Sequence, residues 1–126
     1  MKKGIVVLGH GSQTVVDEAN LSLFTVVDLV KTKVPEALVE PAFMMRASQK
    51  QDLQQAIDRL VEQGADHIVV APWFLTNGLH IQQDIPEELA AARERHGDKV
   101  EIAFARHLGP DARIVDVLLD RIGEVQ

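Results

Sequence analysis

The stretch from Gly4 to Ser12 reads Gly-Ile-Val-Val-Leu-Gly-His-Gly-Ser and decides the fold class. Its apolar half is short, bounded by glycines and rich in β-branched side chains, which is typical of a strand buried on both faces. His10 follows this strand directly. Open α/β folds place their ligands at the carboxyl ends of parallel strands. The stretch therefore predicts a buried parallel strand that carries His10 to a binding site.

Outward from this stretch, strand and helix patterns alternate along the chain. Strands are predicted over 4–8, 39–44, 67–73 and 100–105. Helices are predicted over 17–33, 81–96 and 111–122, and a further helix is expected to begin after a cap at Ser48 and to end at Gly64. Pro41 favours an edge position for the second strand, and Pro86 is expected near the first turn of its helix. Helices of this length between strands require right-handed crossovers and a parallel sheet. We expect a three-layer α/β sandwich with a four-stranded parallel sheet, in a single domain over residues 1–126.

Composition limits the chemistry that the chain can support. The 126 residues include no cysteine, which excludes disulfides, thiolate catalysis and cysteine-based metal clusters, so any metal must be held by nitrogen or oxygen. The formal net charge of -6 argues against a general nucleic-acid binder, which needs a basic face. No apolar run approaches the about 20 residues of a membrane span, and the run at the amino terminus is too short for a signal peptide. We expect a cytoplasmic protein with no membrane partner.

Polar and basic residues follow all four predicted strands. His10 and His80 come after the first and third strands, Arg46 after the second, and Arg106 with His107 after the fourth. Because the carboxyl ends of parallel strands meet at one edge, we expect the two imidazoles to lie close enough to share one metal ion. The basic side chains would focus positive potential on the same cleft, and guanidinium groups bind carboxylates in a bidentate way. The sequence thus predicts a paired-histidine site beside a site for an anionic ligand.

Several of these residues also have a plainer interpretation. A histidine after a strand is often a hydrogen-bonded loop residue, so both histidines can be incidental. Asp84 lies one helical turn after His80 and either orients that imidazole or is an acid stabilised at a helix amino terminus. His96 is expected to be a cation at a helix carboxyl end, and His67 to be structural. Four apolar residues near His80 either fill the core or line a dimer interface: Trp73, Phe74, Leu75 and Leu79.

Three motifs carry a resemblance to a known family. They are Gly9-His10-Gly11-Ser12, Gly78-Leu79-His80 with Asp84-Ile85-Pro86, and Leu108-Gly109-Pro110-Asp111. With Ala42-Phe43 and Gly64-Ala65, they make the chain similar over nearly its whole length to the short sirohydrochlorin chelatases, which are relatives of cobaltochelatases, nickelochelatases and ferrochelatases. The combination is more specific than any one of the motifs alone.

The resemblance implies a chelatase-like fold and a metal chelatase activity of the lyase type. The expected reaction inserts divalent cobalt, nickel or iron into sirohydrochlorin or a similar anionic tetrapyrrole, in cobalamin or sirohaem biosynthesis, with no organic cofactor. The family's metal-binding and catalytic histidines match His10 and His80; imidazole suits these metals and can also accept a proton. The matched motifs extend the expected substrate contacts to Gly11, Ser12 and Gly78. The resemblance also implies a homodimer, with the cleft near its interface.

Two positions depart from the family's usual pattern. Met45 stands where relatives carry a glutamate that can bind metal or relay protons, and Gln13 stands where they often have arginine. These departures leave a second interpretation open, a paralogue that binds tetrapyrrole or metal without inserting it. A third is a structural or interaction α/β domain. The sequence does not separate the ligand role from the base role of the two histidines, and it does not select the metal.

Overall fold

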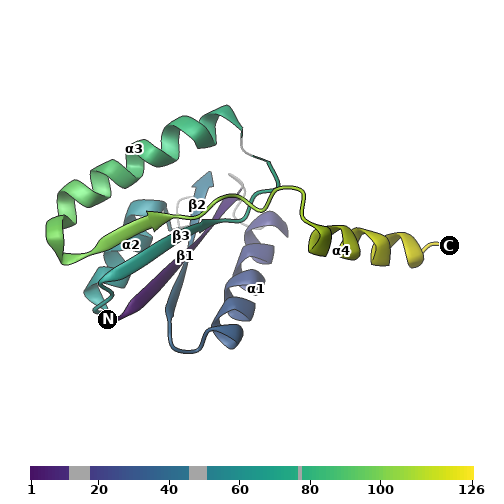
Figure 1. Ribbon diagram of the computed structural model, residues 1–126, viewed down its shortest axis with the longest axis horizontal. Helices are drawn as coiled ribbons and strands as arrows, with labels where there is room; N and C mark the ends of the chain where they lie inside the picture. Colours follow the sequence, from purple (N-terminus) through teal and green to yellow (C-terminus); the bar gives the residue numbers. More distant parts are fainter. Residues whose placement is uncertain (12–17, 46–50, 77) are drawn as a thin grey trace.

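The computed structural model describes residues 1–11, 18–45, 51–76 and 78–126, with the backbone alone for 18–20, 45 and 79–82 (Figure 1). Its strands are β1 (Lys3–Gly11), β2 (Leu38–Met45), β3 (His67–Pro72) and β4 (Glu101–Phe104). Its α-helices are α1 (Glu18–Lys33), α2 (Leu53–Glu62), α3 (Leu79–His96) and α4 (Ala112–Gly123), and a short 3-10 helix covers Gly97–Lys99. The four strands form one sheet in the order β2-β1-β3-β4, and all neighbouring pairs are parallel. The predicted parallel sheet is confirmed, and so is the edge position of the Pro41 strand.

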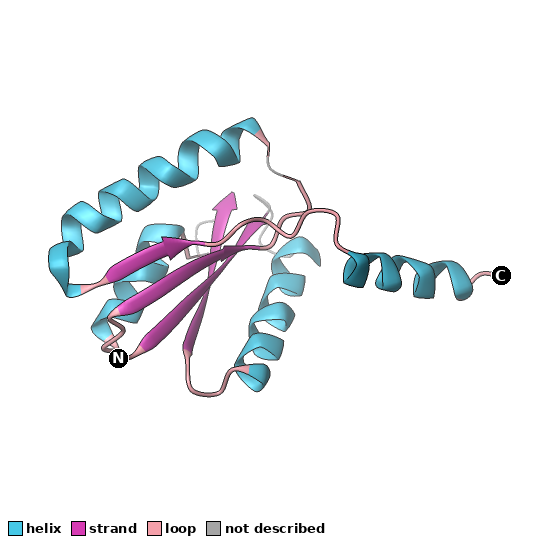
Figure 2. Ribbon diagram, in the orientation of Figure 1, coloured by secondary structure: helices cyan, strands magenta, loops and turns pink. Residues whose placement is uncertain are grey.

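Helices lie on both faces of the sheet, which makes the predicted three layers (Figure 2). On one face, α1 packs against β1 and β2, and Leu23 and Val27 of α1 are buried with Val7 and Phe43. On the other face, α2 and α3 enclose the larger core cluster, which includes the fully buried Leu8. Burial of these side chains supplies the main driving force for folding.

The ends of α2 and α3 differ from the sequence prediction. The α2 helix begins at Leu53 with Asp52 as its cap, and Asp52 and Gln55 form a reciprocal capping box; Ser48, the predicted cap, lies outside the described residues. The α3 helix begins at Leu79 rather than 81, so Pro86 lies inside the helix and not in its first turn. Pro86 has no N–H and therefore leaves one helical hydrogen bond unmade, while Ile85 and Leu89 of the same helix are both buried in the larger core cluster.

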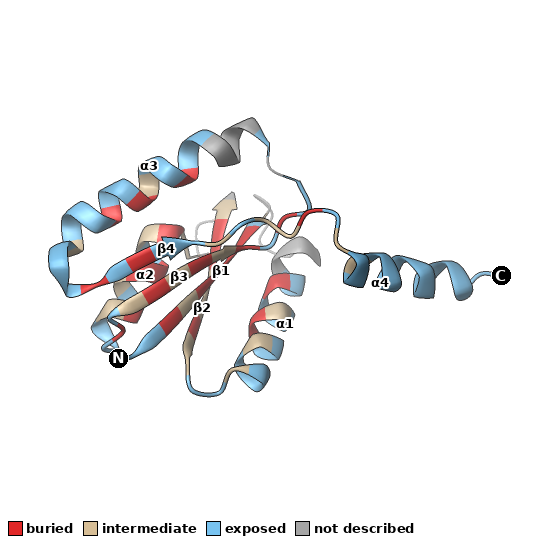
Figure 3. Ribbon diagram, viewed as in Figure 1, coloured by how far each residue is buried: buried red, intermediate tan, exposed pale blue. Residues whose placement is uncertain are grey.

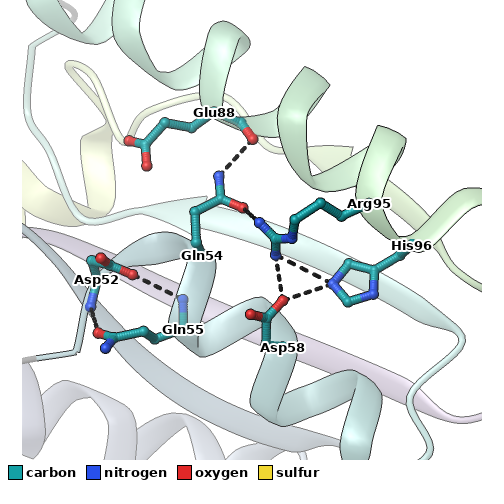
Figure 4. A network of polar contacts seen from close by, with 7 residues as sticks. All are labelled: Asp52, Gln54, Gln55, Asp58, Glu88, Arg95 and His96. Atoms are coloured by element: carbon teal, nitrogen blue, oxygen red, sulfur yellow. Dashed lines mark hydrogen bonds and ion pairs between the residues drawn. The ribbon is translucent and has the colours of Figure 1, made fainter.

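A polar network fastens α2 to α3 (Figure 4). The Nε2 atom of His96 lies 2.7 Å from Oδ1 of Asp58, and the Arg95 guanidinium donates to both Asp58 and Gln54. The Gln54 amide in turn donates to the backbone carbonyl of Glu88 at 2.7 Å. His96 does lie in the last turn of its helix, as predicted, but its contact is a carboxylate on the neighbouring helix.

The α4 helix stands apart from the three layers. Asp111 caps it by accepting from the backbone N–H of Arg113 at 2.9 Å. The helix has no buried residue, and Figure 3 shows it as an exposed arm leading away from the sheet. Sequence periodicity predicted the helix correctly, and its position outside the three layers was not predicted. Among the described residues, none of the helices is both long and apolar enough to cross a membrane.

Candidate functional site

The two predicted site histidines follow neighbouring strands at the same edge of the sheet. β1 and β3 are hydrogen-bonded to each other in parallel, with Leu8 opposite Pro72. His10 lies near the end of β1, and the His80 backbone lies in the first turn of α3, which begins shortly after β3. Since the His80 side chain is not described, a shared metal ion remains a prediction.

The His10 imidazole is exposed and is backed by an aromatic ring. The ring of Phe74 meets it edge-on, with 6.4 Å between centroids and 77° between planes. Phe74 is only 8% exposed, so it belongs to the core, whereas Trp73 and Leu75 beside it are 49% and 59% exposed. The backbone N–H of Trp73 donates to the Leu8 carbonyl at 2.7 Å, which continues the pairing of β1 and β3 beyond Pro72. The site therefore has a buried apolar base and exposed apolar flanks.

The segment that follows β4 runs beside the end of β3. Ala105 donates its N–H to the Val70 carbonyl, and Leu108 donates to the Phe74 carbonyl, each at 2.9 Å. These bonds bring the exposed Arg106 and the half-buried His107 to the same edge as His10. The structure thus supports the predicted placement of both residues, although it does not test their contact with a substrate.

A hollow of about 430 Å³ opens beside this segment, lined by Arg106, His107, Leu108, Asp111, Arg113 and Ile114. Within it, Arg113 makes a bidentate pair with Asp111, through Nε and Nη2 at 2.8 Å each. Hydrogen bonds from Arg113 hold the pKa of the Asp111 carboxyl well below its usual range, with a smaller contribution from the charge of Arg106. Asp111 is therefore ionised and paired with Arg113. Arg106 and His107 are the lining groups suited to bind an anionic ligand.

Other predicted residues are placed only in part. Ser12, Gln13 and Arg46 lie outside the described residues, and the Met45 side chain is not described. Gly11 ends β1 with φ 75°, and Gly78 precedes α3 in an extended conformation as its N-cap. Asp84 is exposed in α3, one turn after His80. Among the side chains that the structure describes, no three histidine or acidic groups gather as a metal site.

Sequence reasoning missed Glu88, which lies one turn after Asp84 on α3. Its side chain is half-buried, and burial, reinforced by the charges of Asp52 and Asp84, raises the pKa of its carboxyl despite the opposing Gln54 amide. The spacing of His80, Asp84 and Glu88 places the three on one face of the helix. That spacing was the sequence signal that could have pointed to Glu88. The burial that distinguishes Glu88 comes from the packing of α3 over α2.

Comparison with known proteins shows the family to which the chain belongs. The family model described as CbiX matches residues 4–125. The chain belongs to the CbiX family. Among the curated proteins, the chloroplastic sirohydrochlorin ferrochelatase of Arabidopsis thaliana is 38% identical, over 94% of this chain and 51% of the relative. A sirohydrochlorin cobaltochelatase of Sulfolobus acidocaldarius is 34% identical over 94% of this chain and 88% of its own. This CbiX-family chain thus spans about half the length of some relatives and most of others.

Among solved structures too, the chain spans about half of one relative and nearly all of another. The sirohydrochlorin chelatase SirB from Bacillus subtilis subspecies spizizenii, in complex with cobalt, matches with a TM-score of 0.86 and 30% identity. That match covers 99% of this chain and 51% of SirB. A CbiX protein from Marinobacter aquaeolei, described as a putative cobalamin biosynthesis protein, matches with a TM-score of 0.73 and 27% identity, over 97% of this chain and 95% of its own. The chelatase-like fold predicted from the motifs is confirmed.

Proposed function

We propose that this chain inserts a divalent metal into sirohydrochlorin or a similar anionic tetrapyrrole. The observation that carries the proposal is the placement of His10 and His80 after neighbouring parallel strands at one sheet edge, in a chain of the CbiX family. The names of its relatives support both the macrocycle and the choice of cobalt or iron. Nickel is a further candidate from the sequence alone.

In this proposal the histidines perform the two tasks that metal insertion requires. Two pyrrolic protons must leave the macrocycle as the metal enters, and a neutral imidazole can bind the metal or accept a proton. His10 is exposed at the strand end, where it can reach a substrate. Asp84, one turn after His80, is the proposed orienting carboxylate. The raised pKa of Glu88 suits it to take up protons from the same helix face.

The substrate would lie along the carboxyl edge of the sheet. Trp73 and Leu75 offer exposed apolar surface for a flat macrocycle, and Arg106 and His107 offer positive charge for its carboxylates. Gly11, Ser12 and Gly78 belong to the proposed contacts through the matched motifs, and Arg46 belongs to them because it follows the second predicted strand in the sequence. We also propose that two copies pair, because relatives of about twice this length share the fold of this chain over half of their own. A cytoplasmic location, a single domain and the absence of an organic cofactor stay predictions.

The reaction can be followed directly. The purified protein is incubated with sirohydrochlorin and Co²⁺ or Fe²⁺ under anaerobic conditions, and the visible spectrum of the macrocycle reports the rate of metallation. The proposal predicts a rate well above that of the protein-free mixture, and loss of this excess in His10→Ala. The matched control is His67→Ala, which removes a histidine at the opposite edge of the sheet, where it pairs with Glu101 at 3.0 Å.

Binding of sirohydrochlorin without acceleration would instead favour the non-inserting paralogue, to which Met45 in place of the family's glutamate points. Absence of any binding of metal or macrocycle would favour an interaction domain. Either result contradicts the proposed catalysis, provided that circular dichroism shows the protein to be folded.

A further inference from the structure

The imidazole of His10 lies on the face of the sheet that α2 and α3 cover. Side chains alternate between the two faces of a strand, and Val6 and Leu8 of β1 are buried in the core cluster on that face. His10 is the next residue of this series, and it is exposed. Phe74, from the segment after β3, is buried in the same cluster and meets the imidazole edge-on. The last side chain of β1 on this face therefore contacts a core aromatic ring.

The polar contact of this imidazole is weak. Its Nδ1 atom lies 3.4 Å from the carbonyl oxygen of Gly11, to which it donates when it carries the ring proton. That distance is long for a hydrogen bond, and a bond between exposed groups contributes little net free energy. The ring torsion of histidine is also broad, so such a bond leaves the ring several orientations. Of the two contacts, the one with Phe74 is the firmer.

Phe74 is itself fixed in place. Its side chain is 8% exposed and is packed in the cluster that also contains Ile85 of α3, the helix whose first turn carries His80. Its backbone carbonyl accepts from the N–H of Leu108 at 2.9 Å. A close-packed ring of this kind has few alternative orientations. Phe74 thus offers His10 a fixed surface that belongs to the same core as the helix of His80.

We propose that Phe74 is a positioning residue, whose buried ring holds the His10 imidazole in the orientation in which it meets the metal ion. The inference rests on the proposed metal insertion, and it assigns Phe74 a role that acts through His10. Fixing the imidazole before the metal arrives removes the entropy cost of ordering an exposed side chain at that moment. An edge-on aromatic pair is strong enough to favour one orientation by about two- to tenfold.

Two phenylalanines provide a matched test. Phe24 of α1 also forms an edge-on pair, with Phe43, at 5.7 Å between ring centroids and on the other face of the sheet. Phe74→Leu and Phe24→Leu make the same change, and leucine keeps apolar bulk at each position. Metal-free samples of the full chain are compared by NMR, where three-bond couplings report the χ1 rotamer of His10.

We expect a dominant His10 rotamer in the wild type and in Phe24→Leu, and averaging among rotamers in Phe74→Leu. Averaging already in the wild type would overturn the proposal, and so would an unchanged His10 rotamer in Phe74→Leu. A loss of stability alone does not produce this pattern, because the couplings are measured on the folded protein. The Phe24→Leu sample controls for the general effect of removing a packed ring.

Metallation kinetics test the consequence for the reaction. Phe74→Leu should lower kcat about three- to tenfold, and Phe74→Tyr, which keeps the ring, should restore most of it. The KM for sirohydrochlorin should stay nearly unchanged in Phe74→Leu, because the substitution keeps the backbone bond to Leu108 and with it the segment that carries Arg106. A rise in KM without a fall in kcat, or equal losses of kcat in Phe74→Leu and Phe24→Leu, would contradict the positioning role.

Failure of this inference is distinguishable from failure of the proposed function. A wild type that metallates, with a Phe74→Leu variant of equal kcat, would overturn the role of Phe74 alone. A wild type that does not metallate would overturn the proposed function, and with it any role of Phe74 in metal insertion. The rotamer measurement needs neither metal nor macrocycle, so it decides in both cases whether Phe74 orients His10.

Discussion

Gly9 of β1 lies so close to Leu23 of α1 that a Cβ on Gly9 would be 2.8 Å from the Cδ2 of Leu23. Leu23 is 1% exposed and is packed among Val7, Val27 and Phe43, so it has little room to move. The absence of a side chain at position 9 lets α1 pack tightly beside the strand that ends at His10. Gly9 therefore has a packing role, in addition to its place in the motif.

Gly9→Ala should destabilise the fold without removing a site side chain. The added methyl group overpacks the core, and we expect a loss of about 1–3 kcal/mol in the free energy of unfolding. Urea denaturation followed by circular dichroism measures this loss. Gly123→Ala at the end of α4 is the control, because no atom lies within 4 Å of the position of its Cβ. Equal stability of the Gly9 variant and the wild type would contradict the packing role.

His96→Ala should loosen the contact between α2 and α3. The imidazole is 16% exposed in its side chain and is bonded to Asp58, and its removal leaves that carboxylate with the more exposed Arg95. A loss of about 1–2 kcal/mol in unfolding free energy is expected. Arg121→Ala, which removes an exposed pair with Glu124 on α4, should cost much less. A His96 variant as stable as the Arg121 variant would show that the network between α2 and α3 does not contribute to the free energy of unfolding.

Glu88→Gln should raise stability at neutral pH and not at acidic pH. Because the folded state raises the pKa of this carboxyl, its ionised form is disfavoured there, and the wild type loses stability as pH rises through the raised value. The neutral amide avoids this penalty, so the variant should gain up to about 1 kcal/mol at pH 7, and the gain should vanish below about pH 4. Thermal unfolding at several pH values measures both the gain at neutral pH and its loss at acidic pH. A gain that is independent of pH would show that ionisation is not its cause.

Arg106→Ala should weaken tetrapyrrole binding, since Arg106 lines the hollow at the carboxyl edge. The affinity should fall about two- to fivefold at low salt, as for an exposed ion pair, and the difference should shrink as salt screens the charges. Fluorescence titration with sirohydrochlorin measures the affinity. Arg59→Ala, on α2 near Glu40, should leave it unchanged. An equal effect of both substitutions would show that the affinity depends only on the net charge of the protein.

Much of the fold could be predicted because its signals are local. The β-branched run before Gly9 predicts a buried strand wherever the rest of the chain lies, and Pro41 predicts an edge strand because it cannot donate to a ladder. The interior position of Pro86 in α3 has no such local signal, and it is accompanied by the burial of Ile85 and Leu89. That burial depends on contacts with α2 and the sheet.

The site was predictable in its position but not in its surroundings. The topology of a parallel sheet brings His10 and His80 to one edge whatever their neighbours are. The environment of Glu88 depends on how α3 packs over α2. The position of α4 outside the three layers is likewise not given by its sequence, because periodicity identifies the apolar side of a helix but not the surface that this side contacts.

His10 and His80 are proposed to act as a pair on one metal ion. A double-mutant cycle on the rate of Co²⁺ insertion tests it most directly, with His10→Ala, His80→Ala and the double variant compared with the wild type. If the residues act as a unit, each single variant should lose nearly all of the acceleration, and the double variant should be no slower than the slower single variant. Partial losses in the single variants that multiply in the double variant would show two independent residues and contradict the paired site.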